Sequence, residues 1–169
     1  MKKIFLLFLF IMMFWVSGNV FSQTREKMAI LPFKAYSNDS RAIQEMKDLQ
    51  GFLTTEILKT KKFTLVERAR LDEIMKEMKL SSSSMSYKDI QRLGQTLGVN
   101  KILTGEFVRL ASTAGVASYF FTVNVRIIDV RTGFIDVSIT IDKERFPWSG
   151  NNILIKVAEL ITQEIMENY

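Results

Sequence analysis

The sequence predicts a mixed α/β fold in which one layer of parallel and antiparallel strands packs against helices. Three observations support this prediction. A strand pattern, a long helix pattern and a second strand pattern follow one another early, as in a βαβ unit. Two helix patterns come next. Two long alternating patterns separated by a turn then precede a last helix, so the expected order is β-α-β-α-α-β-β-β-α.

The beginning of the chain has the pattern of a secretory signal peptide. Two lysines precede an unbroken apolar run over residues 4–16, and a small-residue cleavage site ending in Ser22 follows. An uncleaved membrane anchor is the alternative, but a spanning helix takes about 20 apolar residues. We therefore expect residues 1–22 to be a cleaved signal peptide that directs residues 23–169, one α/β domain, to the periplasm.

The first strand and helix of the domain follow from residues 28–59. The segment MAILPF at residues 28–33 predicts a strand in which Pro32 allows only the end or an edge to be regular. Asp39 or Ser40 can cap the next helix. Gly51 lies inside that helix, where glycine costs about 1 kcal/mol relative to alanine, and close contact with the sheet would explain it. The apolar stripe of this helix consists of Ile43, Met46, Leu49, Leu53 and Ile57.

The middle of the chain predicts a strand, two helices and a returning strand. Residues 63–66 are β-formers and predict a buried strand, and four serines at residues 81–84 separate the two helix patterns. Ser86 with Asp89 approximates a capping box for the second helix. Gly98 stands where a left-handed helix end favours glycine. The first helix presents the stripe Leu71, Ile74, Met75 and Met78, and the second presents Ile90, Leu93 and Leu97.

The last third predicts a strand, an antiparallel hairpin and a helix. Residues 102–108 form the strand, in which Gly105 indicates a bulge or a close approach, and residues 111–118 form a loop. Alternation from Tyr119 predicts two strands joined by a turn at residues 131–133. The residues expected to face inward are Phe121, Val123, Val125, Ile127, Ile135, Val137, Ile139 and Ile141. A helix capped by Asn151 or Asn152 ends the domain, with Leu154, Val157, Ile161 and Ile165 inward.

Composition argues against catalysis and against several ligands. The chain has no histidine and no cysteine, which excludes a Ser-His-Asp triad, thiol chemistry, disulfides, acylation as a lipoprotein and His or Cys metal sites. Scattered basic residues do not favour nucleic acid. Four carboxylates are catalytic candidates, and each has a structural explanation in an ion pair, a turn or a solvated sheet face: Glu67, Glu106, Asp129 and Asp136. We expect no enzyme, no cofactor and no metal.

Four segments in order carry a family resemblance. MAILPF, LVERARLDEIMKEMKL, LGQTLGVNKILTGEF and VRIIDVRTG resemble the CsgG family, which includes the curli secretion channel subunit and is related to LpoB-type activators of penicillin-binding proteins and to the amino-terminal domain of TolB. The resemblance implies a small α/β domain with a non-catalytic role in the envelope. Two departures argue against a pore: the missing lipoprotein cysteine, and a 111–118 loop too short for spanning strands of about 9–11 residues.

Three surfaces are candidates for partner binding. Aromatic residues at strand ends and in a loop could anchor a partner or close the end of the core: Tyr119, Phe120, Phe146 and Trp148. Three methionines could line an adaptable groove or fill the core: Met75, Met78 and Met85. The polar face of the hairpin could pair with another subunit or face solvent: Thr122, Asn124, Arg126, Ser138 and Thr140.

Two functions from different classes therefore remain open. The first is a periplasmic protein that assists envelope assembly, secretion or partner activation by protein–protein binding. The second is a subunit of a curli-type export channel at the outer membrane. Expected partners are envelope or outer-membrane proteins, including further copies of this chain, and we expect membrane association without spanning.

Overall fold

The computed structural model describes residues 25–36, 40–81, 84–110, 120–142 and 151–169. Its strands are β1 (Glu26–Ile30), β2 (Lys34–Ala35), β3 (Phe63–Leu65), β4 (Lys101–Leu110), β5 (Phe120–Asp129) and β6 (Ile135–Asp142). Its helices are α2 (Ser40–Lys59), α3 (Arg68–Glu77), α4 (Tyr87–Leu97) and α5 (Asn151–Glu167). The predicted class and order are confirmed, with β2 added. The expected signal peptide and the 111–118 loop lie outside the described residues.

All the strands belong to one mixed sheet in the order β3-β1-β4-β5-β6, with β2 beside β4. The pairings of β1 with β3 and β4 are parallel, whereas β4–β5 and β5–β6 are antiparallel. The first strand was expected at residues 28–33 but runs from Glu26 to Ile30. Pro32 cannot donate to the ladder, so pairing stops before it and resumes beyond it, where Lys34 pairs with Glu106.

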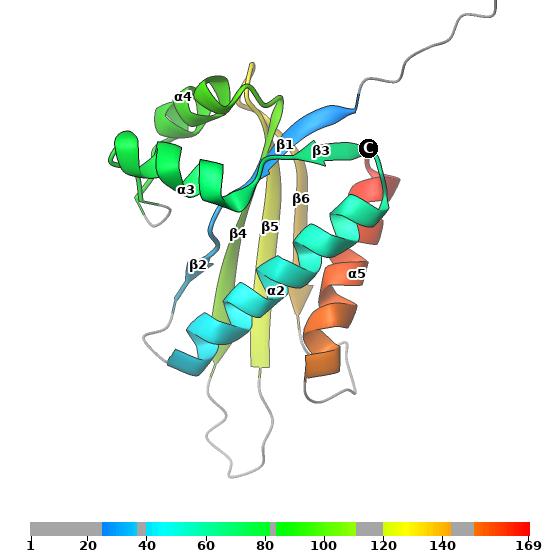
Figure 1. Ribbon diagram of the computed structural model, residues 1–169. Helices are drawn as coiled ribbons and strands as arrows, with labels where there is room; N and C mark the ends of the chain where they lie inside the picture. Colours follow the sequence, from blue (N-terminus) through cyan, green and yellow to red (C-terminus); the bar gives the residue numbers. More distant parts are fainter. Residues whose placement is uncertain (1–24, 37–39, 82–83, 111–119, 143–150) are drawn as a thin grey trace, which may run out of the picture.

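The two faces of the sheet are covered differently (Figure 1). On one face α2 and α5 pack against each other and against the sheet, forming the larger core. On the other face α3 and α4 cover β1 and the beginning of β4, forming a second core. Successive strand residues point to opposite faces, so Met28 and Leu103 enter the first core while Ala29 and Ile102 enter the second.

The edge strand β3 departs from its prediction. It was expected to be buried, but only Phe63 is, at 2% exposed, while Thr64 is exposed. An edge strand has one neighbour in the sheet, here β1. Among the described helices, none is both long enough and apolar enough to cross a membrane.

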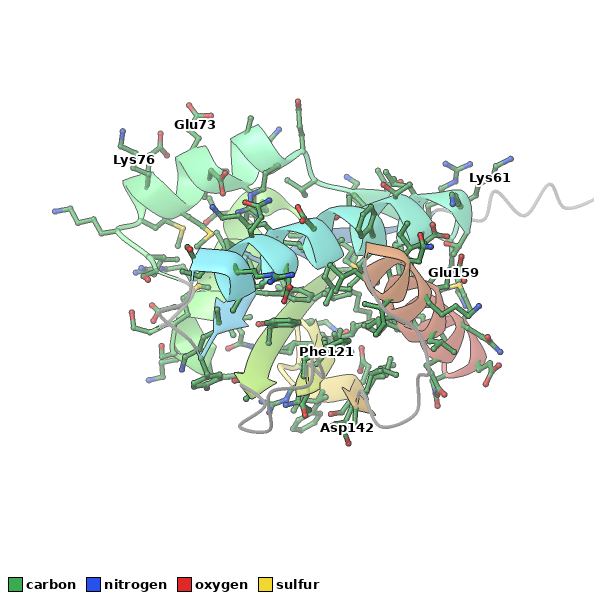
Figure 2. All side chains as sticks on the ribbon, turned by 90° about the horizontal axis from the view of Figure 1, so that it is seen from below. Lys61, Glu73, Lys76, Phe121, Asp142 and Glu159 are labelled. Carbon is green, nitrogen blue, oxygen red and sulfur yellow. The ribbon has the colours of Figure 1, made fainter. Side chains whose placement is uncertain are left out.

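The hairpin of β5 and β6 follows the predicted alternation, except at its turn end. Phe121 points into the core (Figure 2), and the inward residues from Val137 to Ile141 are buried. Ile135, however, is 53% exposed, so its expected inward position was wrong. The pairing steps from Ile127–Val137 to Ile128–Ile135, which leaves Asp136 as an extra residue. Such a bulge puts the residues on its two sides out of phase.

The ends of α4 confirm their predictions. Ser86 and Asp89 form a capping box, in which the Ser86 hydroxyl accepts from the Asp89 amide and the Asp89 carboxylate accepts from the Ser86 amide. Gly98 closes the helix in the left-handed conformation with φ 67°. A capping box satisfies two of the amides that a helix start leaves free, so this pair fixes where α4 begins.

Glycines inside helices and strands have different surroundings. Gly94 of α4 is buried, and a β-carbon there would overlap both terminal methyl groups of Val130. Gly105 of β4 meets the Phe33 ring, 2.7 Å from where its β-carbon would lie, which confirms the predicted close approach. Gly51 of α2 is exposed, and a β-carbon there would meet nothing within 4 Å. The expected contact of Gly51 with the sheet was therefore wrong.

Replacing each helical glycine by alanine should give opposite results. Gly51→Ala should raise the free energy of unfolding by about 1 kcal/mol, because alanine has the better helix propensity and meets no neighbour. Gly94→Ala should lower it by about 1–3 kcal/mol, because overpacking against Val130 outweighs the same propensity gain. Urea unfolding followed by circular dichroism measures both. A destabilising Gly51→Ala would contradict the open surroundings of that position.

Candidate binding surface

The polar face of the hairpin lies outside the second core that α3 and α4 form over the sheet. On the α3–α4 side, Ile102 and Val130 are the residues of β4 to β6 and their connection that join the second core. Farther along the strands the same face carries partly or fully exposed polar side chains. We call this the open sheet face, defined as Thr104, Glu106, Thr122, Asn124, Arg126, Ser138, Thr140 and Asp142.

Hydrogen bonds between strands order this face. The Thr140 hydroxyl donates to Asn124 Oδ1 at 2.9 Å, and the Thr122 hydroxyl donates to Asp142 Oδ1 at 2.7 Å. At the β2 side, Lys34 Nζ lies 4.4 Å from the centre of the Tyr36 ring, a cation–π distance. These contacts fix polar groups of both charges on a rigid sheet, which suits recognition of another polar surface better than chemistry.

A shallow pocket of about 210 Å³ lies where the open sheet face meets α4. Its polar lining includes Lys34, Glu106 and Arg126, and Met85 closes one side. Of the three methionines weighed as a groove, Met75 is 6% exposed in the second core and Met78 and Met85 pack partly buried against it. Core filling therefore describes Met75, and Met85 adds an adaptable apolar wall to the pocket.

The predicted aromatic anchors cannot be placed here. Tyr119, Phe146 and Trp148 lie outside the described residues, and Phe120 is described only through its backbone at the start of β5. Tyr36 was not among the predicted binding residues. Its side chain is 50% exposed, and its hydroxyl donates to Glu106 Oε1 at 3.4 Å. Its signal was an aromatic residue in a loop after a strand, the same signal that selected the other aromatics.

The four carboxylates weighed for catalysis fall into separate places. Glu67 caps α3 by position but makes no side-chain cap bond, and the expected pair with Arg68 is replaced by one between Arg68 Nε and Asp72 at 3.0 Å. Glu106 lies on the open sheet face. Asp129 and Asp136 meet at Lys101, where they form the densest charged cluster of the described residues.

This Lys101 cluster is a closed network. Lys101 Nζ donates to Asp129 Oδ2 at 2.9 Å and to Asp136 Oδ2 at 2.7 Å. Asp129 Oδ1 also accepts from the Thr132 amide at 2.7 Å, which confirms its predicted role in the turn. Asp136 was expected on the solvated sheet face, but the bulge places it against Lys101 instead. No sequence pattern marked Lys101, since it opens an otherwise ordinary strand.

The contacts in the network shift the pKa values of Lys101 and Asp129. Hydrogen bonds from Lys101 and from Thr132 hold the pKa of Asp129 far below its usual range. Burial opposes the charge of Lys101, but its hydrogen bonds with Asp136 and Asp129 outweigh burial and raise its pKa. Burial also raises the pKa of Tyr169, which lies beside Lys101. A general base needs a pKa near the working pH, whereas these shifts favour the charged, paired forms of Lys101 and Asp129 at neutral pH, as in a structural ion pair.

Removing the positive charge of Lys101 tests how much the network contributes to the free energy of unfolding. Lys101→Met should lower the free energy of unfolding at pH 7 by about 2 kcal/mol, because it leaves two carboxylates without their charge partner. Asp129 has a lowered folded-state pKa, so its contribution is present above the unfolded pKa of about 4 and is lost as pH falls further. The variant should therefore lose less stability between pH 5 and pH 2 than the wild-type protein, measured by urea unfolding.

Lys156→Met provides the control for this prediction. Lys156 pairs with Glu159 at 2.8 Å on the surface of α5, with the two side chains 51% and 44% exposed. Exposed pairs contribute about 0–1 kcal/mol. Equal losses for the two variants, or an unchanged acid limb in Lys101→Met, would contradict the structural role of the Lys101 cluster.

Comparison with known proteins supplies the family context. Residues 16–162 match the family model described as curli production assembly/transport component CsgG. No curated protein matches the sequence.

Among the described residues, no group of histidine, cysteine, aspartate or glutamate side chains could hold a metal ion.

Several solved structures share the fold at low sequence identity. The lipoprotein GNA1162 from Neisseria meningitidis is similar with a TM-score of 0.58 and 14% identity, over 84% of this chain and 99% of that one. The LpoB C-terminal domain from Escherichia coli gives 0.54 and 17%, over 78% and 91%. The PelC dodecamer from Paraburkholderia phytofirmans gives 0.52 and 15%, over 85% and 86%.

Proposed function

The chain belongs to the CsgG family, and from that membership we propose that it is a non-catalytic protein of the cell envelope. It acts in the periplasm after cleavage of residues 1–22, and it assists assembly, secretion or partner activation by binding other envelope proteins. The observation that carries this proposal is the open sheet face, a rigid and ordered polar surface that no described helix covers.

Two further observations support a binding function rather than a reaction. The sequence has no histidine or cysteine, and the carboxylates with the strongest interactions are held by Lys101 in a structural network. The similar structures include proteins named as a lipoprotein, a LpoB domain and a PelC dodecamer. Their shared fold is compatible with the proposal.

A second candidate is a subunit of an outer-membrane export channel that assembles from copies of itself. The family description names transport, and one similar structure is a dodecamer. In this version the open sheet face contacts the neighbouring copy. Cell fractionation separates the two candidates: a binding protein leaves with the soluble periplasm, whereas a channel subunit stays with membranes and crosslinks into regular multiples of its own mass.

Crosslinking in intact cells tests the proposed function. Wild-type protein should give a reproducible adduct with an envelope protein, identified by mass spectrometry after affinity capture. Ser138→Arg with Thr140→Arg should reduce this adduct about tenfold, because both side chains are exposed on the open sheet face and arginine adds bulk and charge there. Tenfold corresponds to about 1.4 kcal/mol of binding.

The matched control is Gln95→Arg with Thr96→Arg, which adds the same charges to exposed positions of α4. It should leave the adduct unchanged. A wild-type protein that forms no adduct with any envelope protein, or that remains in the cytosol with residues 1–22 attached, would reject the proposed function. Equal loss in the two double variants would reject the open sheet face as its surface.

A further inference from the structure

A groove separates α2 from the segment that joins β3 to α3, on a different part of the molecule from the open sheet face. It has a volume of about 410 Å³. Its floor is apolar and consists of Ile30, Leu65, Val66 and Leu71. The wall on the α2 side is Gln50, Gly51 and Thr54. We call it the α2–α3 groove.

The packing of the fold gives no reason for a glycine at position 51 inside α2, whereas the groove beside it does. It is exposed, a β-carbon would meet nothing within 4 Å, and its φ is not positive. Glycine inside a helix still costs about 1 kcal/mol relative to alanine. A missing side chain at this point lowers the wall of the groove and lets another molecule approach the backbone of α2, a recognised use of glycine.

Two basic residues flank the opening of the groove. Lys47 lies one turn before Gly51 on α2, lines the groove and makes no ion pair with another described residue. Arg68 begins α3 on the opposite side, and its side chain is 50% exposed although Nε pairs with Asp72. An apolar floor between two cations is complementary to an apolar group that carries a negative charge beside it.

We propose that the α2–α3 groove binds a segment of a partner protein that inserts one large apolar side chain, crosses α2 over Gly51, and places an aspartate or glutamate between Lys47 and Arg68. A peptide fits better than a small ligand, because the groove is open along its length and small ligands favour clefts that enclose most of their surface. The α2 wall is held in place from within the domain: the Gln50 side-chain amide donates to the Leu31 carbonyl at 3.0 Å, and the Thr54 hydroxyl donates to the Gln50 carbonyl at 2.8 Å. This inference rests on the proposed binding function and assigns it a second contact.

Selection from a displayed library of random 12-residue peptides tests the groove on the exported full chain. Peptides that bind should pair a leucine or an aromatic residue with a nearby aspartate or glutamate. Gly51→Gln should weaken the best peptide about tenfold or more, because the new side chain lies across the groove. Lys47→Glu should weaken it by a similar factor through charge repulsion.

Matched variants keep the result interpretable. Lys88→Glu makes the same charge change at an exposed position of α4 and should leave peptide affinity within twofold. Gly51→Gln has open space for its side chain, so its circular dichroism should match that of the wild-type protein and its free energy of unfolding should be equal or slightly higher, because glutamine has a better helix propensity than glycine. Peptides without acidic residues, a selection that yields no peptide weakened by Gly51→Gln, or equal weakening by Lys88→Glu would overturn the proposal.

The crosslinking experiment in cells separates this inference from the function on which it rests. If the Gly51→Gln variant forms the adduct at the same yield as the wild-type protein, the groove does not hold the partner. The inference then fails, while the binding function stands. If the wild-type protein forms no adduct, the binding function itself fails. Loss of the adduct in Gly51→Gln and in Lys47→Glu, with retention in Lys88→Glu, supports both.

Discussion

Strand β4 is the element on which the rest of the structure depends. It pairs in parallel with β1 and β2 along one side and antiparallel with β5 along the other. Its first residues lie between two helical layers, with Ile102 and Leu103 at 0% exposed on opposite sides. Its later residues have a helical layer on one side only. One strand therefore joins a three-layer region to a two-layer region, and the open sheet face results from that change.

Much of this arrangement could be predicted from the sequence, because it rests on local patterns. The period of Leu71 and Met75 places α3, the Ser86–Asp89 pair begins α4, and the alternation from Phe121 to Ile127 sets the inner face of β5. Each pattern reflects interactions within a few residues, which is what sequence periodicity records.

The remaining features depend on contacts between distant segments. The bulge at Asp136 and the exposure of Ile135 arise from the pairing of β5 with β6, which no single strand encodes. The network at Lys101 joins residues from three strands, so the lysine looked ordinary. The sequence indicated that a glycine at position 51 of a helix is unusual, but the expected contact with the sheet was wrong. Open space beside a helix produces no pattern in the sequence. The exposure of the polar face of the hairpin was predicted residue by residue from its alternation, whereas the predicted aromatic surface lies outside the described residues apart from the backbone of Phe120.

Among the described strands, β6 has a neighbour on one side only, and this has a consequence for self-association. An uncovered edge strand is a template on which another chain can extend the sheet, the first step toward insoluble fibres. If two copies of β6 paired antiparallel with their Ile139 residues opposite each other, Asp142 of one copy would lie opposite Asp136 of the other. The bulge makes the strand irregular at Asp136. The bulge at Asp136 and the acidic Asp142 therefore disfavour edge-to-edge pairing of two copies of β6.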